Sequence, residues 1–252
     1  MMNPAEFANI AKSEQNFWWY RGMREILFRV LDPLVRERPI RRVLEAGCGT
    51  GFMSRRVQER YGWSIVPIDL GWEGLAYGRA LGVERMCQAD IRAVPFPDGA
   101  FDAVLSLDVI VHLPVGEEDR PMSEFGRLLV PGGLLVVRVS ALDVLRSRHS
   151  QFAHERQRFT KRRLAELARR HGFRVLRATY ANSLLLPVAL AKFRIWEPLV
   201  GAPAASGVDP MAPWLDKLLY APLAAESRWL GAGFNLPAGQ SLLLIAEKAA
   251  GK

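Results

Sequence analysis

The stretch that decides the fold is Val43-Leu44-Glu45-Ala46-Gly47-Cys48-Gly49-Thr50-Gly51. It begins as a short apolar run typical of a buried strand and passes through three glycines into a helical pattern. Glycine lets the backbone approach a ligand closely, and the start of the following helix offers free amide donors. A dinucleotide fingerprint, GxGxxG, would place its third glycine at position 52, where this chain has Phe52. The spacing GxGxG therefore disfavours NAD-linked redox chemistry.

Short apolar runs alternate with helical stretches on both sides of this turn. The runs at 42–46, 63–69, 83–89, 101–107 and 134–140 predict parallel strands covered by helices, and two more strands are expected at 173–180 and 241–246. We therefore expect an α/β, Rossmann-like, doubly wound sheet of seven strands. The predicted organisation is an N-terminal helical lid (1–39), a core (40–182), a helical cap insertion (183–238) and a last core strand (239–252).

Further motifs follow in the order found in class I S-adenosylmethionine-dependent methyltransferases, which this chain resembles. Residues 94–102 (VPFPDGAFD) are similar to the LPFpdgsFD signature of the ubiquinone-biosynthesis-like branch, methyltransferase type 11. Residues 107–113 (LDVIVHL) and 129–133 (LVPGG) resemble the motifs after the fourth strand and before the fifth. Together with the GxGxG turn, these motifs cover residues 43–140.

The resemblance implies S-adenosylmethionine as cofactor and gives each contact a position. Asp69, with Leu70, ends the second strand, where a carboxylate can accept hydrogen bonds from both ribose hydroxyls. Asp90 and Ile91 match the positions that meet the adenine amine and pack on its ring. The candidate cofactor-binding residues are Tyr20, Arg24, Glu45, Gly47, Cys48, Gly49, Gly51, Asp69, Leu70, Asp90, Ile91 and Asp108.

The N-terminal flank supplies Tyr20 and Arg24 in this set. Residues 14–25 (EQNFWWYRGMRE) resemble the E..HWWf..RR segment of a subset of these enzymes that is often found with polysaccharide or lipid-linked pathways. A helix over roughly 21–35 would close over the cofactor, with Tyr20 and Arg24 near its carboxylate. The alternative is that Trp18 and Trp19 simply bury this helix against the sheet.

Two histidines after the fifth strand, His149 and His154, are the candidate catalytic residues, since a hydroxyl acceptor needs a base. The related subset commonly has His-Asp where this chain has His149-Ser150, so the usual carboxylate neighbour is missing. The alternative is a pair of solvent-exposed loop histidines.

Charge is concentrated in one segment of the 252-residue chain, whose net charge is +8. Residues 141–180 contain 11 basic and 3 acidic side chains, whereas residues 1–140 contain 17 and 18. A nucleic-acid partner is not expected, because basic residues are neither widespread nor interleaved with aromatic ones. The segment could bind an anionic acceptor, make a peripheral membrane contact beside the apolar cap, or be a solvated helix face.

Two cysteines, Cys48 and Cys87, provide neither a disulfide framework nor a CxxC pair, so no metal is expected. The absence of a signal pattern at the N-terminus and of an unbroken apolar span indicates a cytoplasmic protein.

The sequence thus predicts an enzyme that methylates a small or lipid-like metabolite. The predicted reaction is in-line O-methylation with a histidine base. The alternatives are methylation of RNA or another macromolecule, and a noncatalytic partner protein with this fold. The methyl acceptor and the oligomeric state stay open.

Overall fold

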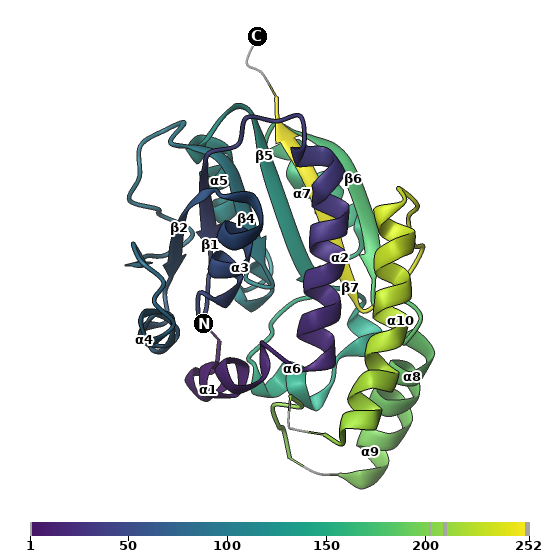
Figure 1. The fold of residues 1–252 in the computed structure, drawn as a ribbon. Coiled ribbons are helices and arrows are strands. Elements are labelled where there is room, and N and C mark those ends of the chain that lie inside the picture. Colours follow the sequence, from purple (N-terminus) through teal and green to yellow (C-terminus); the bar gives the residue numbers. More distant parts are fainter. Residues whose placement is uncertain (1, 202, 209–210, 250–252) are drawn as a thin grey trace.

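Seven strands form one mixed sheet at the centre of the fold (Figure 1). The computed structural model describes residues 2–201, 203–208 and 211–249. The strand order is β3-β2-β1-β4-β5-β7-β6, with β7 antiparallel to both neighbours and the first five strands parallel. This confirms the predicted fold class. The strands are β1 (Arg42–Ala46), β2 (Ser64–Asp69), β3 (Cys87–Gln88), β4 (Phe101–Leu107), β5 (Leu129–Ser140), β6 (Phe173–Ala181) and β7 (Ser241–Lys248).

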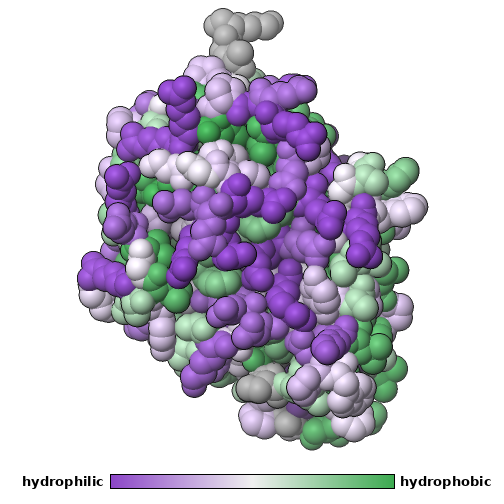
Figure 2. All heavy atoms as spheres, in the orientation of Figure 1, coloured by the Kyte–Doolittle hydropathy of each residue, from purple (hydrophilic) through white to green (hydrophobic). Residues whose placement is uncertain are grey.

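Helices cover both faces of the sheet and extend beyond one end of it (Figure 1). Hydrophilic residues dominate the view in Figure 2, whereas hydrophobic ones gather along its right-hand and lower edge, where Figure 1 places α8, α9 and α10. The helices are α1 (Pro4–Ser13), α2 (Trp18–Val35), α3 (Phe52–Tyr61), α4 (Trp72–Ala80), α5 (Asp119–Leu128), α6 (Arg148–Phe152), α7 (Lys161–Arg170), α8 (Leu186–Ala191), α9 (Glu197–Val200) and α10 (Pro213–Gly231), with short turns η1 (Ile110–His112), η2 (Asp143–Leu145) and the π-helical η3 (Lys192–Trp196).

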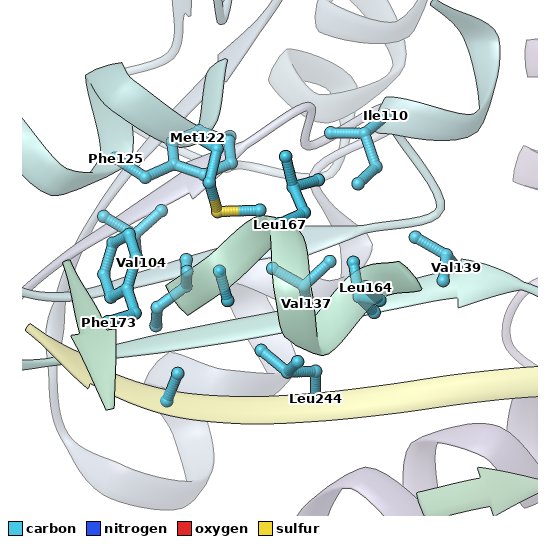
Figure 3. Close-up of a cluster of buried hydrophobic side chains, with 14 of the residues drawn as sticks. Val104, Ile110, Met122, Phe125, Val137, Val139, Leu164, Leu167, Phe173 and Leu244 are labelled. Carbon is cyan, nitrogen blue, oxygen red and sulfur yellow. The ribbon is translucent and has the colours of Figure 1, made fainter. Parts of the chain in front are cut away.

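The core consists of two layers, one on each side of the sheet, because side chains alternate along the strands. On β5, Val137 and Val139 face one layer and Val136 faces the other. Figure 3 shows the first layer, where Met122 and Phe125 of α5 and Leu164 and Leu167 of α7 converge on the sheet. The second layer is formed chiefly by α2, α3 and α10.

Helices α2 and α10 lie side by side on this second face (Figure 1). A Cβ at Gly22 would lie 2.4 Å from Leu223 Cδ1, so only glycine permits this approach. Asp216 of α10 accepts hydrogen bonds from the Trp18 amide and the Arg21 guanidinium. Most of α2 and the second half of α10 therefore contribute buried side chains to the second core layer.

The third strand is shorter than predicted. The apolar residues at 83–89 suggested a strand throughout, yet β3 contains only Cys87 and Gln88. Arg85 adopts φ +59°, in the left-handed region, which interrupts extended backbone ahead of the strand.

The strand order reverses between β1 and β4, and the carboxyl ends of these strands lie at that point. In open α/β sheets such a switch point leaves a crevice for a ligand.

Candidate active site

The glycine turn after β1 is held tightly against the neighbouring strand. The amides of Gly47 and Cys48 both donate to the Ile68 carbonyl at 2.8 Å. Gly47 has φ +86°, and a Cβ there would lie 2.3 Å from Val109 Cγ2. Gly49 and Gly51 also have positive φ, and Gly51 directly precedes α3. The turn therefore needs glycine for conformation and for close packing.

Glu45 lies beneath this turn. Its side chain is buried and accepts a hydrogen bond from the Ser54 hydroxyl of α3. Burial, reinforced by the nearby Asp69 carboxylate, raises the pKa of Glu45 to about 7. This hydrogen bond links the end of β1 to the first turn of α3.

Asp69 joins the glycine turn to the loop after β2. Its Oδ2 accepts from the Gly49 amide at 2.8 Å and its Oδ1 from the Gly71 amide at 2.7 Å. Burial raises the pKa of this carboxyl group even though both amides favour the ionised form. Because each carboxylate oxygen can accept two hydrogen bonds, both keep capacity for a ligand. Leu70, the next residue, is exposed.

Asp90 is engaged by a neighbouring side chain. The Arg92 guanidinium contacts both carboxylate oxygens, with Nη2 2.7 Å from Oδ2, and its Nη1 lies 2.6 Å from Glu117. Arg92 holds the pKa of Asp90 below its ordinary value. Ile91 is buried in the first core layer. Asp90 therefore lies at the expected end of β3 with an arginine partner that sequence reasoning missed.

Asp108 follows β4 and is paired with a buried arginine of β5. Arg138 donates through Nε at 2.8 Å and Nη2 at 2.6 Å to Asp108 Oδ2, and its guanidinium lies 5.3 Å from the Trp19 ring centroid. Asp108 itself has φ +60°, which directs the backbone back across the end of the sheet. Arg138 was missed, although one arginine within the apolar run 134–140 was a visible signal.

The residues around α2's start bring more carboxylates to this end of the sheet. Burial raises the pKa of Tyr20 well above its ordinary value, and the Glu6, Glu14 and Asp108 carboxylates act in the same direction. Glu14 accepts a hydrogen bond from the Thr50 hydroxyl in the glycine turn, and burial raises its pKa to about 7. Tyr20, Asp108 and the glycine turn thus lie at the same end of the sheet.

Arg24 lies beside Glu14, in the first half of α2. Its Nη1 donates to the Glu14 carbonyl at 3.2 Å, and its guanidinium lies 5.3 Å from the Phe52 ring centroid. It therefore fixes the turn between α1 and α2 against α3.

Helix α1 lies over the glycine turn. The Phe7 ring is so close that a Cβ added at Gly71 would lie 2.7 Å from it, and one at Gly74 would lie 2.6 Å from it. Its neighbour Glu6 is buried and accepts a hydrogen bond from Ser206 at 2.9 Å. No local pattern in the sequence pointed to either residue.

The two predicted catalytic histidines are both exposed, but their neighbours differ. His149 Nδ1 lies 3.8 Å from Glu6 Oε1, at the site. Ser150, which replaces the usual carboxylate neighbour, instead caps α6 with Ser147. His154 is exposed, and its carbonyl lies 3.3 Å from His112 Nδ1. Burial lowers the pKa of His112 to about 4.

Most arginines of the basic segment 141–180 form ion pairs within the molecule. Its arginines pair with acidic side chains of the same segment and of neighbouring elements: Arg146 with Asp143, Arg158 with Glu155, Arg162 with Glu166, Arg163 with Glu118, Arg170 with Asp119, and Arg174 with Glu247. This favours the solvated, intramolecular interpretation of the segment.

Comparison with known proteins is consistent with this geometry. A family model described as a methyltransferase domain matches residues 44–137. Demethylmenaquinone methyltransferase of Thermus thermophilus is 37% identical over 43% of this chain and 51% of its own length. Malonyl-[acyl-carrier protein] O-methyltransferase of Enterobacter lignolyticus is 35% identical over 50% of this chain and 51% of its own length. The chain thus spans about half the length of these curated relatives.

A solved structure extends the similarity to most of the fold. Geranyl diphosphate C-methyltransferase of Streptomyces coelicolor, in complex with Mg²⁺, geranyl diphosphate and S-adenosyl-L-homocysteine, matches with a TM-score of 0.54 and 15% identity. The match covers 84% of this chain and 73% of that one. At this identity the match shows the shared fold.

Proposed function

Residues 44–137 are a methyltransferase domain of the S-adenosylmethionine-dependent class, and from this premise we propose that the chain methylates a hydroxyl group of a small or lipid-like metabolite. The observation that carries the proposal is the arrangement of the glycine turn, Asp69 and Asp108 around the switch point of the sheet. The predicted recognition of this class is confirmed for the matched residues.

The residues present fit the cofactor. The three glycines of the turn have positive φ, Gly47 has no room for a Cβ beside Val109, and Asp69 retains acceptor capacity for a ribose diol. We infer that Tyr20 and Asp108 would hold the methionine part of the cofactor. When bound, the cofactor supplies an electrophilic methyl group on a sulfonium. The protein's own part is therefore positioning and exclusion of water.

His149 is the base that the geometry favours. Transfer to a hydroxyl would form an oxygen–methyl bond as the methyl–sulfur bond of the cofactor breaks and S-adenosylhomocysteine leaves, and His149 would take the acceptor proton. Glu6 Oε1, 3.8 Å from His149 Nδ1, would stabilise the imidazolium that forms. Glu6 would thus take the part of the aspartate that the related subset has at the position of Ser150. His154, which has no carboxylate beside it among the ion pairs of the described residues, is the second candidate.

The acceptor class is supported by the relatives. One is named for demethylmenaquinone and another for 2-methyl-6-phytyl-1,4-hydroquinone, and each name describes a quinone or hydroquinone. Such an acceptor has a ring hydroxyl, which a histidine base can deprotonate. It also has an apolar body, which suits a site that excludes water.

The test is transfer of a labelled methyl group to hydroquinones and other hydroxyl acceptors. His149→Ala is expected to lower kcat by at least about 100-fold, since general base catalysis typically contributes that much. His171→Ala is the matched control, because His171 pairs with Asp119 away from the site. Unchanged turnover in both His149→Ala and His154→Ala rejects the base, and no transfer to any hydroxyl acceptor rejects O-methylation.

A further inference from the structure

Apolar side chains are exposed in an unusual concentration on one part of the surface. Of the 16 exposed large hydrophobic residues among those described, 10 lie between positions 184 and 234. We define the outer apolar face as six of them on α8, η3, α9 and the first half of α10, each more than half exposed: Val188, Ile195, Trp196, Leu199, Trp214 and Leu218. Monomeric soluble proteins rarely leave such patches uncovered.

The two sides of helix α10 differ in burial. Leu223, Ser227 and Leu230 are buried against α2 and the sheet. The opposite stripe recurs at helical spacing and contains only apolar and basic exposed residues: Trp214, Lys217, Leu218, Ala221, Ala225, Arg228 and Trp229. The apolar side chains on the inner side of α10 are thus buried within the fold, whereas those on its outer side stay exposed.

The charges on this surface have one sign. Across 184–200 and 213–229, which the structure describes throughout, the exposed charged residues are Lys192, Arg194, Lys217 and Arg228. The acidic side chains of the same two segments are turned to the fold: Glu197 accepts from the Arg148 amide, Asp216 from the Arg21 guanidinium, and buried Glu226 from the Ser183 and Leu184 amides.

Exposed tryptophan, aliphatic residues and lysine or arginine together match the interface of an anionic bilayer. Tryptophan favours the headgroup level, aliphatic side chains enter the acyl boundary, and basic residues attract anionic lipid. In the described residues, no helix is both long and apolar enough to cross a membrane. The contact would therefore lie at the surface of the bilayer.

We propose that the outer apolar face docks this chain on the surface of an anionic lipid bilayer. The face is continuous with the proposed acceptor side, because Glu197 of α9 holds Arg148, which precedes His149 in α6. A lipid-like acceptor would then be collected beside the site. The docking itself does not depend on the proposed methyl transfer.

The test is co-sedimentation of the full chain with vesicles of phosphatidylcholine alone and of phosphatidylcholine with phosphatidylglycerol. Binding is expected to the anionic vesicles and to weaken with salt. Trp196→Ser with Trp214→Ser is expected to weaken it at least about tenfold, since each indole loses burial in the interface. Lys192→Gln and Lys217→Gln are each expected to weaken it about fivefold.

Two matched controls separate this face from other surfaces. Trp72→Ser removes an exposed tryptophan of α4, and Lys161→Gln with Arg169→Gln removes exposed charge from the basic helix α7. Both should bind vesicles as the parent does, and circular dichroism establishes that each variant is folded. The proposal is overturned by absence of binding to either vesicle, by equal losses in the controls, or by a dimer in light scattering that Trp196→Ser and Trp214→Ser dissociate, since a second copy would then cover the face.

Discussion

Replacing Gly47 by alanine tests whether the glycine turn is built by packing as well as by backbone conformation. The residue has φ +86°, and the new Cβ would lie 2.3 Å from Val109 Cγ2 and 2.5 Å from Cγ1. Left-handed backbone costs a residue with a Cβ about 1–2 kcal/mol. Overpacking a filled site costs about 1–3 kcal/mol more. The expected loss in free energy of unfolding is therefore about 2–5 kcal/mol.

Urea denaturation of Gly47→Ala and Gly62→Ala separates the two costs. Gly62 has φ +69° but nothing within 4 Å of a new Cβ, so it carries the conformational cost of about 1–2 kcal/mol alone. Adding Val109→Ala to Gly47→Ala should recover the packing part, seen as a favourable coupling in the double-mutant cycle. Equal losses at the two glycines, or no coupling with Val109, would refute the close contact.

Other consequences concern the elements around the turn. Phe7→Ala should cost about 3–5 kcal/mol in urea unfolding, because the ring fills the space beside Gly71 and Gly74; a loss below about 1 kcal/mol would contradict the packing of α1. The pKa of Glu14 is about 7 in the folded chain and ordinarily 4.5. Between these values the folded chain keeps a proton that the unfolded chain loses, so the free energy of unfolding falls as pH rises through that interval. Glu14→Gln should flatten this fall, and an unchanged pH profile of unfolding argues against the buried carboxyl. Arg138→Leu should cost about 3–5 kcal/mol by leaving Asp108 without its partner, and Asp108→Asn in the same chain should recover much of that loss; no recovery would show that the pairing is not the cause.

Strands with continuous apolar character were predictable from the sequence. The limits of β1 and β4 agree with the predicted runs, and each of these strands has neighbours on both sides. The edge strand β3 is shorter than its apolar pattern, since Arg85 breaks the extended backbone. Position in the sheet does not alone decide the agreement, because the edge strand β6 ends one residue after its predicted run, whereas the central strand β5 begins five residues before its own.

The glycine turn and its acidic neighbours were predictable because their order along the chain follows the order of the strands. What their carboxylates contact was not, since Arg92 and Arg138 become partners only through the folded geometry. Arg138 comes from a different strand than Asp108, so no spacing rule links them.

The placement of α1 could not be derived from local pattern at all. Glu6 and Phe7 look like ordinary residues of an amphipathic helix, yet both are buried at the site through contacts with residues 49–74 and 206. Such long-range packing depends on the whole fold rather than on the sequence around it. The same holds for His149, whose carboxylate neighbour is distant in sequence.

Calorimetric titration with S-adenosylmethionine tests the central claim most directly, with Asp69→Asn as the matched variant. We expect saturable one-site binding with a dissociation constant on the order of micromolar for the parent chain. We expect at least about tenfold weaker binding for Asp69→Asn, which loses the charge on the acceptor of the ribose hydroxyls. No binding by the folded parent chain at high-micromolar ligand would contradict the account.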